Sequence, residues 1–181
     1  RESDLLKLLS SGSSVVAELC GSWKVVEARQ EIIEWLKMDE RVEVAASSLS
    51  SMADDESKRA LMKLAKDEKR MIHSRAAAVG ALATLDPSNT SELAAQVLVK
   101  AETARSAELI FEVFLAKEKA SDHLAAALSG KKINSEIAAA GVRKSLASGG
   151  DTSQLVEALS TAGSLQPIVN RLSGERMKSL I

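Results

Sequence analysis

The chain has 181 residues, 45% of them apolar, which is enough to bury the core of one domain or of one elongated array. Its 24 Lys and Arg against 25 Asp and Glu give a formal net charge of −1, which argues against a nucleic-acid binder, because such proteins carry a basic face. Aromatic residues make up only 2% and Tyr is absent, so the abundant Ala and Leu predict helices and disfavour β-sheets.

The sequence contains no long apolar run and no charged-then-apolar leader, so neither a membrane span nor a secretion signal is expected within it. Cys20 is the only cysteine, which excludes an internal disulfide and a Cys-based metal or haem site. Because the chain opens at Arg1 without a Met, we expect a piece of a longer protein whose other domains lie outside it.

Residues 1–40 are expected to form one or two helices with a degenerate pattern. Trp23 and Trp35 are placed together on the longer of these helices. Terminal repeats of helical arrays are often atypical in this way, because one of their sides must face water.

The sequence pattern over residues 41–165 predicts about four helix pairs. The first helix of each pair starts near Arg41, Ser74, Arg105 and Ser135, and these starts lie 33, 31 and 30 residues apart. The second helices are predicted over Glu56–Ala65, Ser91–Lys100, Ala120–Ser129 and Thr152–Ala162. A recurring helix pair with a period near 30 residues is typical of solenoids, in which each pair buries its apolar face against its neighbours.

Short polar segments separate these helices. Asp86-Pro87 is typical of a cap followed by Pro at the first helical position, and Asn134 or Ser135 could cap the next first helix. Gly149-Gly150 is interpreted as a helix stop, and Asp151 with Gln154 resembles a capping box.

The tail over residues 166–181 is predicted to form a last helix after Pro167. The predicted fold is therefore a single all-α domain over residues 1–181: an α-α superhelix of the HEAT or armadillo kind with about five helix pairs.

No group of residues has the spacing of a catalytic or metal site, so we assign no catalytic, metal or cofactor-binding residue. His73 and His123 lie 50 residues apart and are expected to be ordinary surface or boundary residues, because a metal site needs three or four convergent ligands. Cys20 is interpreted as a small, half-buried packing residue rather than a nucleophile. The acidic run at Asp54, Asp55 and Glu56 is typical of the first turn of a helix.

The remaining concentrations of one residue type also have simple structural interpretations. Lys66, Lys69, Arg70 and the pair Lys131-Lys132 are expected to be solvated loop residues rather than a partner site. Phe111 and Phe114 form the densest apolar cluster and are expected in the core between repeats, with an apolar docking groove as the alternative.

Two stretches resemble a known family. They are RAAAVGALATLDPSNTSELAAQVL from Arg75 and IFEVFLAKEKASDHLAAALSGKKINSEIAAAGVRKSLASGGDTSQLVEALSTAGSL from Ile110, about half of the chain. They are similar to the HEAT-like region of large secreted multidomain proteins of planctomycete-type bacteria. In that family the region lies between a propeller similar to sugar dehydrogenases and a haem-c domain with a CxxCH motif.

The resemblance implies a connector and a periplasmic or secreted location. This chain contains neither CxxCH nor a propeller, so no haem-binding residue is carried over, and any redox chemistry would belong to the flanking domains.

We therefore expect a non-catalytic scaffold or protein-interaction module whose partners are flanking domains of the parent chain or another protein. The second helices of such pairs usually line the concave side. The candidate binding residues there are Glu92, Gln96, Lys100, Asp122, Gln154 and Glu157. One alternative is a free-standing peptide-binding adaptor. Another is a HEAT-like enzyme acting on nucleic acid, which the balanced charge and scarce aromatics disfavour.

Overall fold

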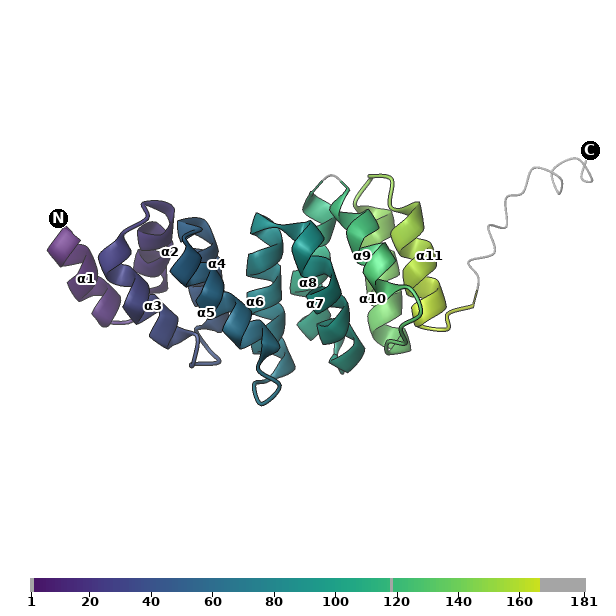
Figure 1. Cartoon of the computed structure of the whole chain (residues 1–181), viewed down its shortest axis with the longest axis horizontal. Helices are drawn as coiled ribbons and strands as arrows, with labels where there is room; N and C mark the ends of the chain where they lie inside the picture. The colour runs from purple at the N-terminus through teal and green to yellow at the C-terminus, as the bar shows by residue number, and fades with distance from the viewer. Residues whose placement is uncertain (1, 118, 167–181) are drawn as a thin grey trace, which may run out of the picture.

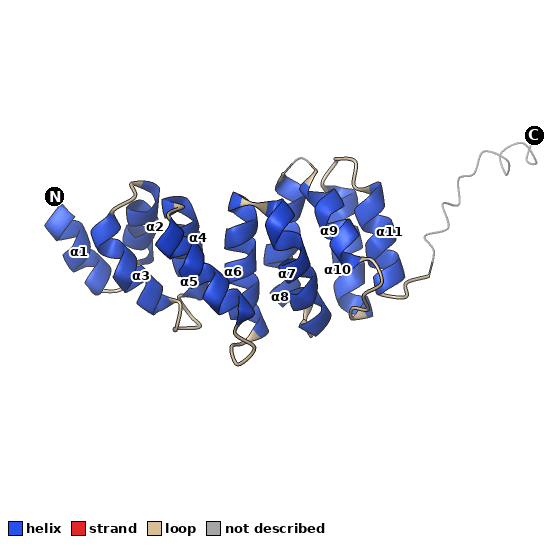
Figure 2. Cartoon of the chain, in the orientation of Figure 1, coloured by secondary structure: helices blue, strands red, loops and turns tan. Residues whose placement is uncertain are grey.

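The computed structural model describes residues 2–117 and 119–166, and within them it shows helices, turns and loops but no strand (Figure 2). The helices follow one another in chain order along an elongated stack, with α1 and α11 at opposite ends (Figure 1). The predicted all-α superhelix of about five helix pairs is thus confirmed. The C-terminal helix predicted over residues 166–181 falls, apart from Gln166, outside the described residues.

The stack has two layers. The first-helix layer contains α2 (Ser14–Ser22), α4 (Val42–Met52), α6 (Ile72–Leu85), α8 (Ala104–Ala116) and α10 (Ser135–Ala147), and each of these helices packs on the next. The second-helix layer contains α3 (Arg29–Trp35), α5 (Asp55–Lys66), α7 (Pro87–Lys100), α9 (Ala120–Leu128) and α11 (Ser153–Ala162). Helix α1 (Glu2–Ser10) and the short 3₁₀ turn η1 (Val26–Ala28) complete the N-terminal end.

The second-helix layer is less regular than the first. Helices α7, α9 and α11 pack side by side, whereas α5 packs mainly against α6 and also touches α3 and α4. Helix α6 is consequently covered by α4, α5, α7 and α8, and every residue from Ser74 to Ala83 is buried. Its Ala-rich sequence fits this position, because small side chains let several helices approach one axis closely.

The helix caps largely follow the predicted signals. Asp86 caps α7 by accepting a hydrogen bond from the Asn89 backbone N–H at 3.0 Å, with Pro87 as the first helical residue. Asn134 caps α10 through the Glu136 N–H at 2.8 Å. Gly149 follows the C-cap of α10 with φ of 73°, a left-handed conformation that suits Gly.

Two local predictions are wrong. Trp23 and Trp35 are not on one helix: Trp23 is the C-cap of α2, whereas Trp35 is the last residue of α3. The chain turns between them because Lys24 adopts a left-handed φ of 55°, and the Val25 N–H bonds back to the Cys20 carbonyl at 2.9 Å. This is a Schellman-type helix end with Lys in the place that Gly usually takes, so the sequence offers no Gly to announce it.

The second wrong prediction is the capping box at Asp151. Helix α11 begins at Ser153 with Thr152 as its N-cap, and the Asp151 carboxylate instead accepts hydrogen bonds from the Ser153 N–H at 3.2 Å and the Ser153 hydroxyl at 2.8 Å. Gln154 is therefore the second helical residue and cannot play the reciprocal part of a capping box.

Pairs of an acidic and a basic side chain join residues about one repeat apart. In five of them the acid precedes the base by 30 to 39 residues, so it lies in the earlier unit. The pairs are Asp39–Arg70, Glu43–His73, Glu68–Lys100, Glu92–Lys131 and Glu112–Lys144, with separations of 2.5 to 3.3 Å. We call these five pairs the inter-repeat ladder.

Candidate binding surfaces

The six predicted binding residues all lie on the second-helix layer, but the structure does not gather them into one site. Glu92, Gln96 and Lys100 are exposed on α7, Asp122 is half-buried on α9, and Gln154 and Glu157 are exposed on α11. Their role in binding stays a prediction, and their surroundings divide them into one group of four and two separate residues.

Four of the six are grouped around Lys131. The Lys131 Nζ lies 3.0 Å from Glu92 Oε1, and the Gln96 amide nitrogen lies 3.5 Å from the same oxygen. Gln154 and Glu157 share with Lys131 a shallow depression of about 570 Å³ between α9 and α11. The hydrogen bond from Lys131 lowers the pKa of Glu92, so this carboxylate stays charged at neutral pH.

The other two predicted residues lie apart from this group. Lys100 pairs with Glu68 at 2.5 Å, and its hydrogen bond lowers the pKa of that carboxyl. Asp122 lines a separate hollow of about 340 Å³ between the start of α9 and the loop before α11, where Gln154 is its only companion from the predicted set.

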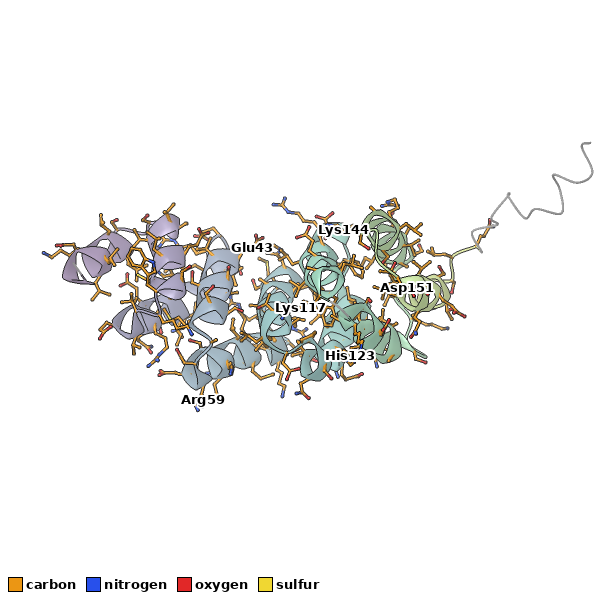
Figure 3. All side chains as sticks on the ribbon, turned by 90° about the horizontal axis from the view of Figure 1, so that it is seen from above. Glu43, Arg59, Lys117, His123, Lys144 and Asp151 are labelled. Carbon is orange, nitrogen blue, oxygen red and sulfur yellow. The ribbon has the colours of Figure 1, made fainter. Side chains whose placement is uncertain are left out.

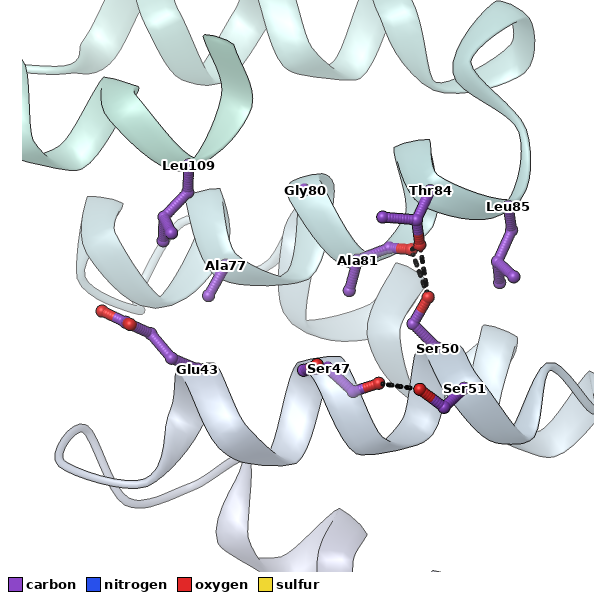
Figure 4. A pocket seen from close by; sticks show the side chains of 10 residues that line it. All are labelled: Glu43, Ser47, Ser50, Ser51, Ala77, Gly80, Ala81, Thr84, Leu85 and Leu109. Atoms are coloured by element: carbon purple, nitrogen blue, oxygen red, sulfur yellow. Dashed lines mark hydrogen bonds between the residues drawn. The ribbon is translucent and has the colours of Figure 1, made fainter. Parts of the chain in front are cut away.

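A different hollow, which the sequence did not predict, opens on the first-helix layer over α6 (Figure 4). Its volume is about 430 Å³, and its floor is made by Ala77, Gly80 and Ala81 of α6. Ser47, Ser50 and Ser51 of α4 form one wall, and Leu109 of α8 stands on the opposite side. We call this depression the α6 hollow.

The α6 hollow exists because its floor lacks large side chains. A Cβ added at Gly80 would lie 3.3 Å from the Leu109 carbonyl oxygen, so the missing side chain lets α8 come close to α6. The wall on α4 is built from serines for the same steric reason. In the sequence the only sign of this hollow is the helical spacing of small residues in two successive first helices.

Three of the four hydroxyl groups that line the α6 hollow donate hydrogen bonds within the protein. Ser50 and Thr84 both donate to the Ala81 carbonyl, at 2.8 and 2.6 Å, and Ser51 donates to the Ser47 carbonyl at 3.1 Å (Figure 4). Among the described residues no base bonds to any of these hydroxyls, so none has the arrangement of an activated nucleophile.

The two ends of the α6 hollow differ in charge. Glu43 lines one end and accepts a hydrogen bond from His73 Nε2 at 2.8 Å. Near the other end the Lys117 amine donates to the Thr84 carbonyl, which belongs to the last turn of α6. A segment lying along this hollow would therefore meet an acidic group at one end and a basic group at the other.

The two histidines, which were considered as catalytic or metal-binding candidates, lie in different surroundings. His73 bonds to Glu43, and His123 is exposed on α9 (Figure 3). In the described part of the chain no group of three or more His, Cys, Asp or Glu could hold a metal ion. Every helix described is too short or too polar to cross a bilayer.

Cys20 is more deeply buried than expected, with no exposed surface. Burial, followed by the nearby Glu31 carboxylate, raises the pKa of its thiol, which makes the reactive thiolate rarer. Asp54 is the N-cap of α5 and accepts a hydrogen bond from the Ser57 N–H at 2.8 Å, as the acidic run at this helix start predicted.

Phe111 and Phe114 are fully buried, which confirms the prediction that they belong to the core between repeats. A Cβ added at Gly141 of α10 would lie 2.7 Å from the Phe111 ring, so this ring fills the contact between α8 and α10. The alternative of an exposed apolar groove at these residues is therefore wrong.

Comparisons of the chain with protein family models, with curated proteins and with solved structures found no match.

Proposed function

We propose that the chain is a non-catalytic scaffold that holds flanking domains, or a protein partner, at a fixed separation. The observation that carries the proposal is the continuous first-helix layer, in which α2, α4, α6, α8 and α10 pack in succession and pairs of acidic and basic side chains connect successive units. In such an array each unit is stabilised by its neighbours, so the length of the array, rather than a pocket, is its main property.

Close packing between neighbouring helices supports a stiff rather than a flexible spacer. The Gly21 Cα lies so near α4 that an added Cβ would be 2.6 Å from the Ser48 carbonyl oxygen. The Ile133 N–H, in the loop before α10, bonds to the Ala162 carbonyl at the end of α11 at 3.0 Å. The first contact leaves little room for α2 to hinge on α4, and the second holds the two helices of the last pair together.

The resemblance to HEAT-like regions of planctomycete-type proteins places this scaffold, as part of the proposal, between two domains of an exported bacterial protein. The coding sequence around this segment tests that placement. A propeller on one side and a CxxCH-containing domain on the other are expected, and other neighbours would contradict the connector role.

A functional test replaces residues 2–166 in the parent protein by a Gly/Ser linker of the same number of residues. Such linkers are flexible coils with no fixed end-to-end distance. We expect each flanking domain to keep its own activity, while any process that needs both domains slows. An unchanged rate for the coupled process would contradict the spacer role.

The α6 hollow favours a second candidate function, a peptide-binding adaptor. Its narrow, small-residue floor and its oppositely charged ends suit an extended segment. Peptides selected from a displayed library on the wild-type chain should lose binding to an Ala77→Leu variant, which fills the floor. Peptides that bind both proteins equally, or a library that yields none, would remove this candidate.

A further inference from the structure

Helix α5 and the loop after it hold the densest concentration of positive charge in the chain. Between residues 58 and 70 there are six basic side chains and two acidic ones: Lys58, Arg59, Lys63, Lys66, Lys69 and Arg70, against Asp67 and Glu68. This cluster was expected to be an ordinary solvated surface, but its position beside an apolar hollow suggests a more specific role.

The hollow lies between α3 and α5 on the second-helix layer and has a volume of about 210 Å³. Ile33 and Leu36, from α3 and its C-cap, and Ala60 and Leu64, from α5, supply its apolar lining. Lys37, Lys63, Asp67 and Arg70 stand at its rim. We call this feature the α3–α5 hollow.

Helical geometry places further cations next to the α3–α5 hollow. Ala60, Lys63, Leu64 and Asp67 share one face of α5 because they recur at three- and four-residue intervals. Arg59, Lys63 and Lys66 form the adjacent exposed stripe, and Arg59 points outward from this layer in Figure 3. The basic stripe therefore runs directly along one edge of the hollow.

The cations of this stripe differ from Lys37 and Arg70, the paired cations at the rim of the hollow. Arg70 is held by the Asp39 carboxylate at 3.3 Å and by the Leu36 carbonyl at 3.0 Å, and Lys37 is paired with Glu34. Among the described residues, by contrast, no acidic side chain pairs with Arg59, Lys63 or Lys66. Asp67, the one acidic residue in the lining, accepts a hydrogen bond from the Lys69 backbone N–H at 3.0 Å.

We propose that the α3–α5 hollow and its basic stripe dock an acidic amphipathic segment of a partner protein, which inserts one bulky apolar side chain between α3 and α5 and sets its carboxylates against Arg59, Lys63 and Lys66. The volume of the hollow suits a single large side chain rather than a whole helix face. A recessed apolar anchor surrounded by charge is the usual make-up of a binding hot spot. The docking role is additional to the spacer role and does not depend on it.

Other polyanions fit this surface less well. The lining of the hollow contains no aromatic side chain on which a nucleic-acid base could stack. A membrane surface would need apolar side chains that project outward, whereas those that line this hollow are recessed; the exposed Met38 and Met71 follow the rim residues Lys37 and Arg70 and do not line it. Charge complementarity together with a recessed anchor site favours a protein segment.

The test measures binding of a fluorescent synthetic helix to the full chain by anisotropy at low and moderate salt. The probe is an amphipathic peptide of about four helical turns with one central Trp and Glu at its flanking positions. A second peptide carries Lys in place of every Glu. We expect the acidic peptide to bind, with an affinity that falls as salt rises, and the Lys peptide to bind at least about tenfold more weakly.

Variants of the chain test whether the acidic peptide binds at the α3–α5 hollow. Arg59→Glu combined with Lys63→Glu should weaken binding of the acidic peptide by about tenfold or more. Ala60→Leu fills the hollow and should weaken binding because the Trp side chain of the peptide can no longer insert. Lys132→Glu is the matched control, because Lys132 is an exposed cation outside this site, in the loop before α10, and we expect a change below about twofold. Circular dichroism and thermal melting verify that each variant is folded.

Several results would overturn the proposal. One is equal binding of the acidic and Lys peptides, and another is binding that survives both the double charge reversal and Ala60→Leu. Binding of single-stranded RNA or of anionic lipid vesicles that is lost in Arg59→Glu with Lys63→Glu, without binding of the acidic peptide, would assign the surface to that other class of partner.

Discussion

Small residues at the contacts between successive first helices determine how closely the units stack. Gly21 is the clearest case, because a Cβ at this position would lie 2.6 Å from the Ser48 carbonyl oxygen and 2.7 Å from the Ser48 Cα. These are backbone atoms, which cannot move aside as the end of a side chain can. The absence of one methyl group thus sets the spacing between α2 and α4.

Gly21→Ala is expected to lower the free energy of unfolding by about 1–3 kcal/mol, because it forces the two helices apart. Gly150→Ala is the control: no atom lies within 4 Å of its added Cβ, and we expect a change within about 0.5 kcal/mol. Urea unfolding followed by circular dichroism measures both. Equal stability of Gly21→Ala and wild type would show that the α2–α4 contact is looser than described.

Cys20 offers a second test at the residue scale. Because the thiol is fully buried and its pKa is raised, we expect it to react with a thiol reagent only after unfolding. A variant that combines Cys20→Ala with Ser22→Cys places a thiol on the exposed end of α2 and should react at once without denaturant. Rapid labelling of native Cys20 would contradict the packing around α2.

At the scale of single helices, the sequence predicted the features that depend on nearby residues, such as helix starts and caps. The Ala- and Leu-rich periodicity located the starts of α4, α6, α8 and α10 to within about two residues, and Asp86-Pro87 marked the true start of α7, although the predicted helix began only at Ser91. The predicted joint helix of Trp23 and Trp35 failed because Lys24 turns the chain without a glycine, and the capping box at Asp151 failed because α11 begins only at Ser153. The α6 hollow could not be predicted either, because it depends on which small residues face each other across α4 and α6.

The α7 cap makes a pH-dependent prediction. Hydrogen bonds from the Asn89 backbone and side chain lower the pKa of Asp86. With a depressed folded pKa, this stabilisation is present above the unfolded pKa of about 3.9 and is lost as pH falls through the folded value. Asp86→Asn keeps an N-cap acceptor that does not titrate. Between about pH 5 and pH 3 the variant should therefore lose less stability than wild type, measured by urea unfolding. Identical losses would contradict the assigned cap.

At the scale of the whole molecule, the inter-repeat ladder and the first-helix layer both connect each repeat unit to the next one. Each exposed pair contributes little by itself, about 0–1 kcal/mol, as for Glu112 and Lys144, whose side chains are 59% and 30% exposed. In each ladder pair the acid lies one unit earlier than the base, so the pairs connect successive units along the stack. A repeat identified from the sequence predicts that residues about one period apart lie close together. It does not predict which acidic and basic side chains form pairs.

The most direct test of a stiff one-dimensional stack is the distance between spin labels in successive units. In a Cys20→Ala background, one label at Glu18 of α2 is paired with a second at Glu112 of α8 or at Arg143 of α10, all exposed on first helices. Pulsed electron paramagnetic resonance should give two narrow distributions, the second longer by about one interhelical spacing of 8–10 Å. Broad distributions, or equal mean distances, would contradict the stack and the spacer role that rests on it.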